Sequence, residues 1–314
     1  MEEKINLSEL KQAALHLGFD DVGVTQATIP DEDKAAYLSW LSKGYQGKLS
    51  YLENQVRCDP NEILPGAKSA IMFVSYYKQP KLPFKKDAGL IASYARGRDY
   101  HNVHRKRLKK FIHWLETKAG ETGIAKGFSD STPILEKALA VQSGLGWFGK
   151  NTLLIHRKFG TFTLLSGVLT TLSFPFSVTS LRLPRCGSCT RCLDACPTQA
   201  FIEPYRLDAS RCLSNHLIES KEELSDDIHK KNPGYLFGCD VCQDVCPHNF
   251  RKIETDAKDF APTRGMGPYL NLEDLKILEE NPELLYGTPL QRRGVRGLQD
   301  NAKGAIKRDA AKGQ

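Results

Sequence analysis

The sequence lacks the apolar segments that would tie the chain to a membrane or to export. No apolar run approaches the roughly 20 residues that a membrane-spanning helix needs. The first residues, Met1-Glu-Glu-Lys-Ile-Asn6, carry acidic charge and do not form the apolar region of a secretion signal. No internal repeat is present either. We therefore expect a cytoplasmic protein without a membrane partner, in which thiols stay reduced.

Cysteine is almost absent outside one short segment, which indicates a metal site rather than a disulfide scaffold. Eight of the nine cysteines lie between residues 186 and 246, and Cys58 stands apart. The segment opens with C-x2-C-x2-C-x3-C-P, the ligand run of bacterial ferredoxins, and closes with a second run that lacks its first cysteine. Cys212 lies between the two runs and can supply the missing ligand.

These thiols match the eight ligands that two [4Fe–4S] clusters need. The fourth cysteine of a ferredoxin run ligates the other cluster, so each expected set combines both runs. The first set is Cys186, Cys189, Cys192 and Cys246, and the second is Cys196, Cys212, Cys239 and Cys242. Zinc is the alternative, because paired C-x2-C motifs also bind zinc. Two clusters indicate electron transfer, and the long segment before them is expected to hold the site that uses the electrons.

The 314 residues predict an α+β protein made of three consecutive segments. These are a front segment at 1–180, a cluster segment at 181–250 and a short helical, basic C-terminal segment at 251–314. Apolar and β-branched runs predict strands at 21–24, 69–77, 90–95, 124–128 and 161–171. Helical spacing predicts helices at 7–17, 33–56, 99–118, 133–143 and 272–286.

Basic charge is in excess and gathers in two runs. The formal net charge is +7 and the pI is about 8.8, which permits a polyanionic partner. We predict phosphate contacts from Arg96, Arg98, Arg105, Lys106 and Arg107 in the first run, and from Arg292, Arg293 and Arg296 in the second. The alternative for any charge run on a helix is a solvated face.

Several short motifs together give the chain a family resemblance. They are Arg57-Cys-Asp-Pro60, Leu64-Pro-Gly-Ala-Lys-Ser69, Gly97-Arg-Asp-Tyr-His101, Asp130 followed by Gly144-Leu-Gly-Trp-Phe-Gly-Lys-Asn151, Gly187-Ser-Cys-Thr-Arg-Cys192 and Tyr235-Leu-Phe-Gly-Cys-Asp240. In this combination the chain resembles the epoxyqueuosine reductases, the cobalamin-dependent enzymes of queuosine biosynthesis. The resemblance covers residues 5–250 and continues weakly into the tail.

The resemblance implies a fold, a reaction and a set of cofactors. The fold would be a cobalamin-binding α/β domain of the nitroreductase and dehalogenase type, followed by a ferredoxin-like domain and a short helical end. The enzyme would reduce epoxyqueuosine to queuosine at the tRNA wobble position. Electrons would pass from an external donor through two [4Fe–4S] clusters to base-off cobalamin. The partner would be the anticodon stem-loop of a tRNA, bound to a monomer.

The resemblance also assigns residues. Asp130 would be the proton donor, because the departing epoxide oxygen is a poor leaving group unless it is protonated. Its place after an apolar strand leads us to expect a pKa raised by desolvation; the alternative is that Asp130 or Ser131 caps the helix that follows. The remaining predicted cobalamin contacts are Arg57, Ala92 (through its backbone), Leu154, Leu165, Leu169, Ser214 and Asp240. A surface position for Arg57 and plain core positions for the leucines are the alternatives.

Other functions also fit parts of the sequence, and the chain departs from the family pattern at several positions. The rivals are a reductive dehalogenase acting on a small molecule, a non-catalytic electron carrier and a cobalamin-handling protein. The chain has no D-x-H-x-x-G motif for a lower-ligand histidine, which fits base-off binding and equally fits the absence of a corrin. Asp300 occupies a position where the family usually has a basic residue.

Overall fold

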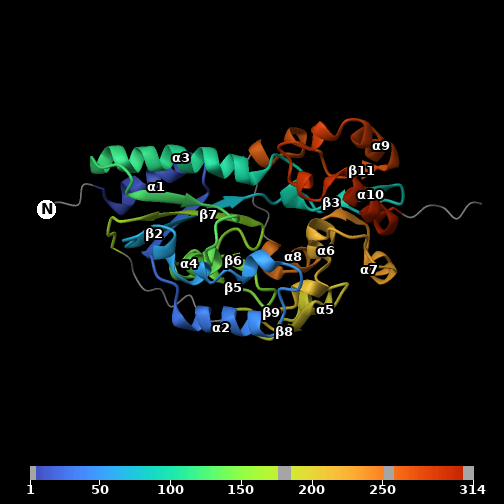
Figure 1. The fold of residues 1–314 in the computed structure, drawn as a ribbon, viewed down its shortest axis with the longest axis horizontal. Helices are drawn as coiled ribbons and strands as arrows, with labels where there is room; N and C mark the ends of the chain where they lie inside the picture. Colours follow the sequence, from blue (N-terminus) through green and yellow to red (C-terminus); the bar gives the residue numbers. More distant parts are fainter. Residues whose placement is uncertain (1–4, 176–184, 251–257, 307–314) are drawn as a thin grey trace, which may run out of the picture. The chain divides into compact units, whose positions relative to one another are not determined.

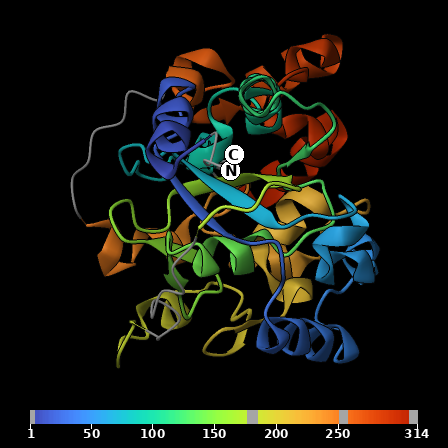
Figure 2. The ribbon, with the colours of Figure 1, turned by 90° about the vertical axis from the view of Figure 1, so that its left-hand side faces the viewer.

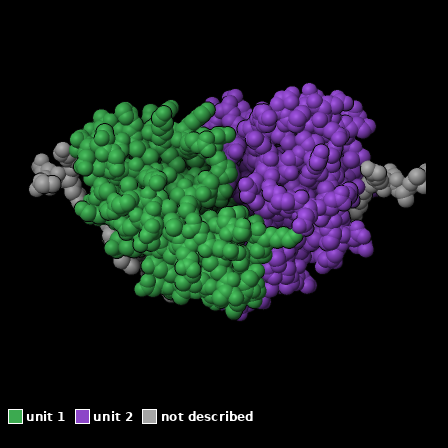
Figure 3. Space-filling view, viewed as in Figure 1, with its two compact units in different colours: residues 1–76, 101–189, 248–255 green, residues 77–100, 190–247, 256–314 purple. Residues whose placement is uncertain are grey.

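The computed structural model describes residues 5–175, 185–250 and 258–306. The chain divides into two compact units, each built from separate stretches of sequence (Figure 3). Unit 1 comprises residues 1–76, 101–189 and 248–255, and unit 2 comprises residues 77–100, 190–247 and 256–314. The units do not follow the three consecutive segments expected from the sequence, because residues 77–100 and the C-terminal segment pack with the cluster segment. No helix of the described ranges is long and apolar enough to cross a membrane.

Unit 1 is built on an antiparallel sheet in the order β1-β2-β7-β4. Its strands are β1 (Asp21–Gln26), β2 (Ser69–Tyr76), β7 (Thr163–Thr170) and β4 (Ala125–Phe128). Helices α1 (Leu7–His16) and α3 (Tyr100–Ala119) cover one face of the sheet, and α4 (Glu136–Gln142) covers the other (Figures 1 and 2). Unit 1 also contains α2 (Asp31–Ser42) and a hairpin of β5 (Gly146–Phe148) and β6 (Leu154–His156).

Burial on both faces explains the sequence of β2. All eight of its residues are buried, so the strand reads as a continuous apolar run instead of alternating with polar residues. Ile71 and Phe73 pack with Phe111 and Leu115 of α3 in the main core of unit 1. Removing such side chains from water contributes roughly 1.5–3 kcal/mol each. This core fixes α3 against the sheet and thereby places the start of α3 relative to the end of β4.

Unit 2 contains a mixed three-stranded sheet in the order β10-β3-β11. β3 (Ala88–Ile91) pairs in parallel with β10 (Tyr235–Phe237) and antiparallel with β11 (Tyr269–Asn271). The remaining elements are α5 (Arg191–Asp194), β8 (Phe201–Glu203), β9 (Arg206–Leu207), α6 (Leu213–Glu219), α7 (Asp226–Lys231), α8 (Val241–Asp244), α9 (Leu272–Glu280) and α10 (Gly294–Ala305). Leu90, Leu213, Leu217 and Tyr235 form an apolar cluster, so the cluster segment has a core of its own besides its thiols.

Three predicted elements end several residues earlier in the structure than in the prediction. The helix expected at 33–56 ends at Ser42, because Gly44 and Gly47 follow with φ of 70° and 56°, and short 3-10 turns replace the rest. The strand expected at 90–95 ends at Ile91 and continues as a 3-10 turn. The helix expected at 272–286 ends at Glu280, before Pro282.

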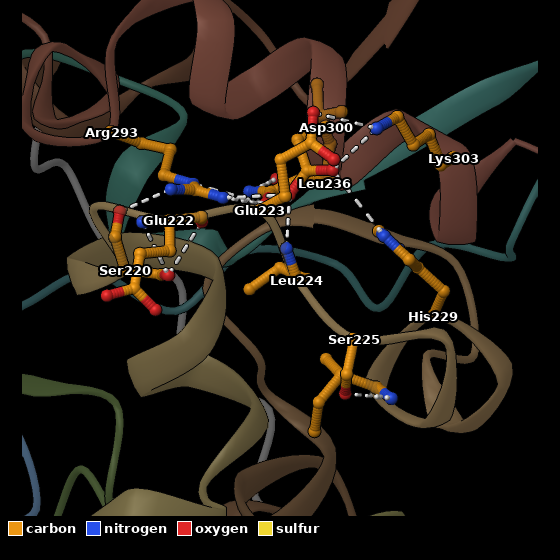
Figure 4. A network of polar contacts seen from close by, with 12 residues as sticks. Ser220, Glu222, Glu223, Leu224, Ser225, His229, Leu236, Arg293, Asp300 and Lys303 are labelled. Atoms are coloured by element: carbon orange, nitrogen blue, oxygen red, sulfur yellow. Dashed lines mark hydrogen bonds and ion pairs between the residues drawn. The ribbon is translucent and has the colours of Figure 1, made fainter.

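A buried polar network fixes α10 to the cluster segment (Figure 4). Asp300 is only 6% exposed, and its Oδ2 accepts a hydrogen bond from the Leu224 backbone N–H at 2.8 Å. The Arg293 Nη2 lies 3.3 Å from the same oxygen, while Lys303 Nζ and His229 Nε2 lie 3.1 Å and 3.6 Å from Oδ1. The acidic residue at the position where the family is usually basic is therefore part of an internal ion-pair network.

Candidate functional site

Asp130 lies just after β4, where the chain turns sharply. Its φ is +51°, a left-handed conformation that residues with a Cβ atom seldom adopt. Its carboxyl Oδ2 lies 3.0 Å from Nε2 of His101, which stands at the start of α3. The side chain is 57% exposed, so the burial that the sequence led us to expect is absent. Asp130 is thus an accessible carboxyl that contacts an imidazole, an arrangement that suits proton transfer.

A buried histidine supports the same turn from behind. His104 is completely buried, and its Nδ1 lies 3.0 Å from the Ser129 hydroxyl. Its Nε2 lies 3.1 Å from the Ser75 hydroxyl in β2. Both ring nitrogens therefore have hydroxyl partners, which ties the residue before Asp130 to the central sheet.

Glu136, the first residue of α4, contacts Asp130 from the other side. Its Oε2 accepts a hydrogen bond from the Asp130 backbone N–H at 3.3 Å. Desolvation of the carboxyl, and then the charge of Asp130, raise the pKa of Glu136 to about 7. Leu135 is the N-cap of α4 and no side chain caps this helix. The alternative prediction, that Asp130 or Ser131 caps the helix, is therefore wrong.

The raised pKa of Glu136 predicts how one substitution changes the pH dependence of stability. Between about pH 4.5 and pH 7 the folded state retains a proton that the unfolded chain releases, so stability falls as the pH rises through this range. Glu136→Gln removes the titration. We expect the variant to gain roughly 3 kcal/mol relative to wild type between pH 5 and pH 8. Thermal midpoints measured across this range should diverge by several degrees, whereas parallel curves would contradict the assignment.

Arg57 is the predicted cobalamin contact that is best placed for a ligand. The residue is only 8% exposed, and its guanidinium carbon lies 5.9 Å from the ring centre of Tyr51. Its buried Nε has no hydrogen-bond partner among the described residues. A buried donor without an acceptor is costly, so Arg57 fits a site that offers an acceptor such as an amide or phosphate oxygen. A surface position for Arg57, the alternative, is excluded.

The other predicted cobalamin contacts differ in accessibility. Leu154 and Leu165 are 3% and 8% exposed, and Ser214 is partly exposed. Leu169 and Ala92 are completely buried, and Asp240 is 2% exposed. Leu169 and Ala92 thus offer no surface to a ligand, Asp240 and Leu154 offer almost none, and the predicted contacts of all these residues stay predictions.

Asp240 instead organises the interior of unit 2 next to the cluster ligands. Its Oδ2 accepts a hydrogen bond from the Ser93 backbone N–H at 2.7 Å, and its Oδ1 accepts one from Gln243 Nε2 at 3.2 Å. The Tyr77 hydroxyl in turn lies 3.3 Å from Gln243 Oε1. Burial raises the pKa of both Asp240 and Tyr77. Sequence reasoning missed Ser93 and Gln243, which carry no motif of their own.

Five cysteines of unit 2 lie close enough to influence one another: Cys192, Cys196, Cys212, Cys239 and Cys242. The ionisation of Cys212, Cys239 and Cys242 is opposed first by desolvation, and further by the charges of neighbouring thiols that include Cys196. All three pKa values are raised, so the free thiolates are disfavoured at neutral pH. Iron offsets both the burial and the mutual repulsion of thiolates. The thiols of the second predicted set lie together and suit a cluster, with Cys192 of the first set also close to Cys242; the division of the ligands between the two clusters stays a prediction.

The first predicted cysteine set is divided between the units. Cys186 and Cys189 belong to unit 1, whereas Cys192 and Cys246 belong to unit 2. In unit 1 the Lys150 Nζ donates to the carbonyl oxygens of Gly187 and Cys189 at 2.7 Å and 3.0 Å. Lys150 thus holds the turn that presents two ligands. Among the described residues no three His, Cys, Asp or Glu side chains form a site for a single metal ion.

Some of the basic side chains predicted to contact phosphate are bonded within the protein, and others are exposed and available to bind RNA. Arg96 is 2% exposed and donates to the Ile91 carbonyl at 2.8 Å, and the Arg293 side chain is 3% exposed. These two arginines have internal roles and are not available to a phosphate, which corrects the prediction for both. Arg98 pairs with Asp259, Arg292 with Glu219, and Arg107 donates to the Gly18 carbonyl. Arg105, Lys106 and Arg296 are exposed and pair with no carboxylate in the described ranges.

A pocket lies beside the Asp130 turn. It has a volume of about 320 Å³ and is lined by α3 and by the end of β4 with the turn that follows. Its polar lining comes from His101, Arg105, Lys109, Ser129 and Ser131. The pocket therefore places basic side chains next to the candidate proton donor.

Two parts of the chain match models of known protein families. Residues 185–249 match the family model described as 4Fe-4S double cluster binding domain, and residues 57–131 match the model described as Epoxyqueuosine reductase QueG, DUF1730. These two matches define the chain as an iron–sulfur oxidoreductase.

Individual relatives narrow this class to one family. An epoxyqueuosine reductase of Cyclobacterium marinum is 41% identical over 243 residues, which cover 76% of this chain and 78% of the relative. The chain belongs to the epoxyqueuosine reductase family. A solved epoxyqueuosine reductase with a tRNA-Tyr epoxyqueuosine-modified stem loop is 29% identical, with a TM-score of 0.84 over 95% of this chain and 80% of that one. The enzyme from Bacillus subtilis, solved with its catalytic loop swung out of the active site, is 29% identical with a TM-score of 0.78 over the same shares.

Proposed function

We propose that this protein reduces epoxyqueuosine in tRNA to queuosine. The observation that carries the proposal is the match, over 95% of the chain, to an epoxyqueuosine reductase solved with the modified stem loop. The reaction adds two electrons and two protons to the epoxide, breaks both carbon–oxygen bonds to the ring oxygen, and releases water. A proton donor and an electron supply are therefore the two requirements that the protein must meet.

In the proposed mechanism Asp130 supplies a proton to the departing oxygen. Its carboxyl is accessible and lies within hydrogen-bond distance of His101, which can return a proton to it after reaction. The His104 and Ser129 contacts hold the turn against the sheet while the proton moves. The reacting ring must therefore approach the exposed face of the Asp130 carboxyl.

The cofactor assignments follow from the side chains that fit each group. Cys196, Cys212, Cys239 and Cys242 would hold one [4Fe–4S] cluster, and Cys186, Cys189, Cys192 and Cys246 the other. Arg57, Leu154, Leu165 and Ser214 would contact base-off cobalamin, with residues of the predicted 1–180 segment supplying most of that site. When bound, cobalamin supplies a strongly reducing cobalt centre, and the clusters supply electrons one at a time. Lys150 keeps the Cys186–Cys189 turn in place for ligation.

The remaining partners follow from the reaction. We infer an external electron donor, because the reaction consumes two electrons at each turnover. A tRNA substrate is consistent with a cytoplasmic protein, and the reaction on one wobble nucleotide needs only a monomer.

The direct test is turnover on an anticodon stem-loop that contains epoxyqueuosine, using cobalamin-loaded protein and a chemical reductant. Nucleoside analysis by mass spectrometry should show conversion to queuosine, with the loss of one oxygen atom. A stem-loop with unmodified guanine at the wobble position is the control substrate. Protein that holds both clusters and cobalamin but forms no queuosine would refute the proposal.

The exposed cations of α3 predict the salt dependence of RNA binding. Arg105 and Lys106 are free to neutralise phosphates, and each neutralised phosphate releases counterions from the RNA. We expect Arg105→Ala and Lys106→Ala each to weaken stem-loop binding and to reduce the slope of log affinity against log salt by about 1. Fluorescence anisotropy at several salt concentrations measures this slope. Lys43→Ala, at an exposed lysine beside α2, is the matched control, and an unchanged slope in the α3 variants would contradict the prediction.

A further inference from the structure

We propose that Glu136 is a positioning residue for Asp130: it holds the loop between β4 and α4 through the Asp130 backbone N–H and so fixes the place of the Asp130 carboxyl. No motif of the sequence points to Glu136. The inference comes from the contacts of this loop.

The loop needs an external hold because its backbone is unfavourable at the decisive residue. Asp130 has a φ of +51°, which tertiary contacts must stabilise in a residue with a Cβ atom. Glu136 Oε2 accepts from the Asp130 N–H at 3.3 Å, and the Leu135 N–H donates to the Arg57 carbonyl at 3.3 Å. The loop is thus held near its start by Glu136 and at its end by Arg57.

Main chain and side chain of Asp130 are held by different elements. Glu136 of α4 binds the backbone, whereas His101 of α3 binds the carboxyl at 3.0 Å. Loss of the Glu136 contact would leave the carboxyl attached to His101 but would release the backbone that aims it. Glu136 does not need to touch the substrate to control the reaction, because its contact is with the backbone of the donor.

The charge of Glu136 makes this contact dependent on pH. Its pKa is about 7, and the charged groups that act on it are Asp130, Lys137 and Arg57. Strands β1 and β6 also pack against α4, and they carry the titratable residues Asp21 and His156. These two side chains contact each other, with His156 Nε2 3.1 Å from Asp21 Oδ2. Above neutral pH the ionised carboxylate is a stronger acceptor for the N–H than the acid, but its burial and its repulsion by Asp130 are larger effects, so ionisation weakens the hold on the loop.

Hydrogen exchange tests the contact without any substrate or reaction. After correction for intrinsic exchange, protection of the Asp130 amide should fall in the wild-type protein as the pH increases from 6 to 8, because ionisation of Glu136 is opposed by burial and by the charge of Asp130 more than it is favoured by the hydrogen bond. Glu136→Leu should increase exchange of this amide about tenfold or more at pH 6, where the wild-type contact is strongest. Glu136→Gln keeps an acceptor of the same shape, so it should retain partial protection that no longer changes with pH. Glu121→Gln, at an exposed glutamate after α3, is the matched control.

Two results would overturn the inference. The first is wild-type protection in Glu136→Leu protein that keeps its iron content. The second is a pH dependence of Asp130 amide protection that is the same in Glu136→Gln as in the wild type. This result would refute the inference even if the leucine variant did not fold. The consequence for turnover rests on the proposed function: single-turnover reduction should slow about tenfold in Glu136→Leu with unchanged stem-loop affinity. Inactive wild-type protein would refute the proposed function but leave the exchange test of Glu136 intact.

Discussion

Replacement of Asp130 by asparagine is expected to lower turnover of epoxyqueuosine stem-loops by about 10²- to 10⁴-fold. General acid catalysis contributes a factor of this size, and asparagine keeps the shape of the side chain but has no acidic proton. The amide can still contact His101, so the loop should stay in place. The measurement is single-turnover formation of queuosine under excess enzyme.

Binding and cofactor content separate this loss from a folding defect. The Asp130→Asn protein should bind the stem-loop with wild-type affinity and contain wild-type iron. Asp87→Asn, at an exposed aspartate before β3, serves as the matched control and should react at the wild-type rate. Turnover of Asp130→Asn within about twofold of wild type would remove Asp130 from the mechanism.

Replacement of Cys242 by alanine is expected to remove one cluster and all turnover. The iron content should fall from about eight to about four atoms per chain, since a [4Fe–4S] cluster is held by four thiolates. Cys242 lies among Cys196, Cys212 and Cys239, and burial keeps its free thiol neutral, so the site is suited to a ligated sulfur. Iron and sulfide analysis of anaerobically reconstituted protein measures the change.

The chain offers an internal control for this experiment. Cys58 stands outside the cluster segment and is a free, partly exposed thiol, and desolvation raises its pKa. Cys58→Ala should retain about eight iron atoms and full turnover. Cys246→Ala should lose the other cluster, which is distinguishable by electron paramagnetic resonance. If Cys242→Ala kept its full iron content, the grouping of the second set would be wrong.

Elements governed by local pattern could be predicted from the sequence. The run at 69–77 became β2, and the run at 161–171 became β7, because unbroken apolar runs of this length fit a sheet covered on both faces. The predicted helix at 33–56 failed at Gly44 and Gly47, where positive φ values outweigh the apolar spacing around them. The end of this helix thus depends on the backbone conformation of single residues, which the amino-acid composition does not predict.

Residues of the candidate site could be predicted from the sequence only where they belong to a recognisable motif. The cluster cysteines follow from spacing, and Asp130 followed from the family resemblance. The roles of Glu136 and of the hydroxyl partners of His104 could not be predicted from the sequence, because these contacts depend on how the loop and α3 are folded. His101 could have been found, since it ends the motif Gly97-Arg-Asp-Tyr-His101. Charge alone could not separate the buried Arg96 and Arg293 from the exposed Arg105.

The strand pairing of unit 2 has a consequence for the synthesis of the protein. β3 ends at Ile91, but its partners β10 and β11 begin at Tyr235 and Tyr269. At about 5–20 residues per second, a ribosome needs roughly 7–30 s to make the intervening chain. Unit 2 therefore cannot close co-translationally until nearly the whole chain has emerged, and the apolar β3 segment must wait exposed meanwhile. Iron–sulfur insertion at Cys239 and Cys242, which follow β10, is correspondingly a late event in the maturation of this protein.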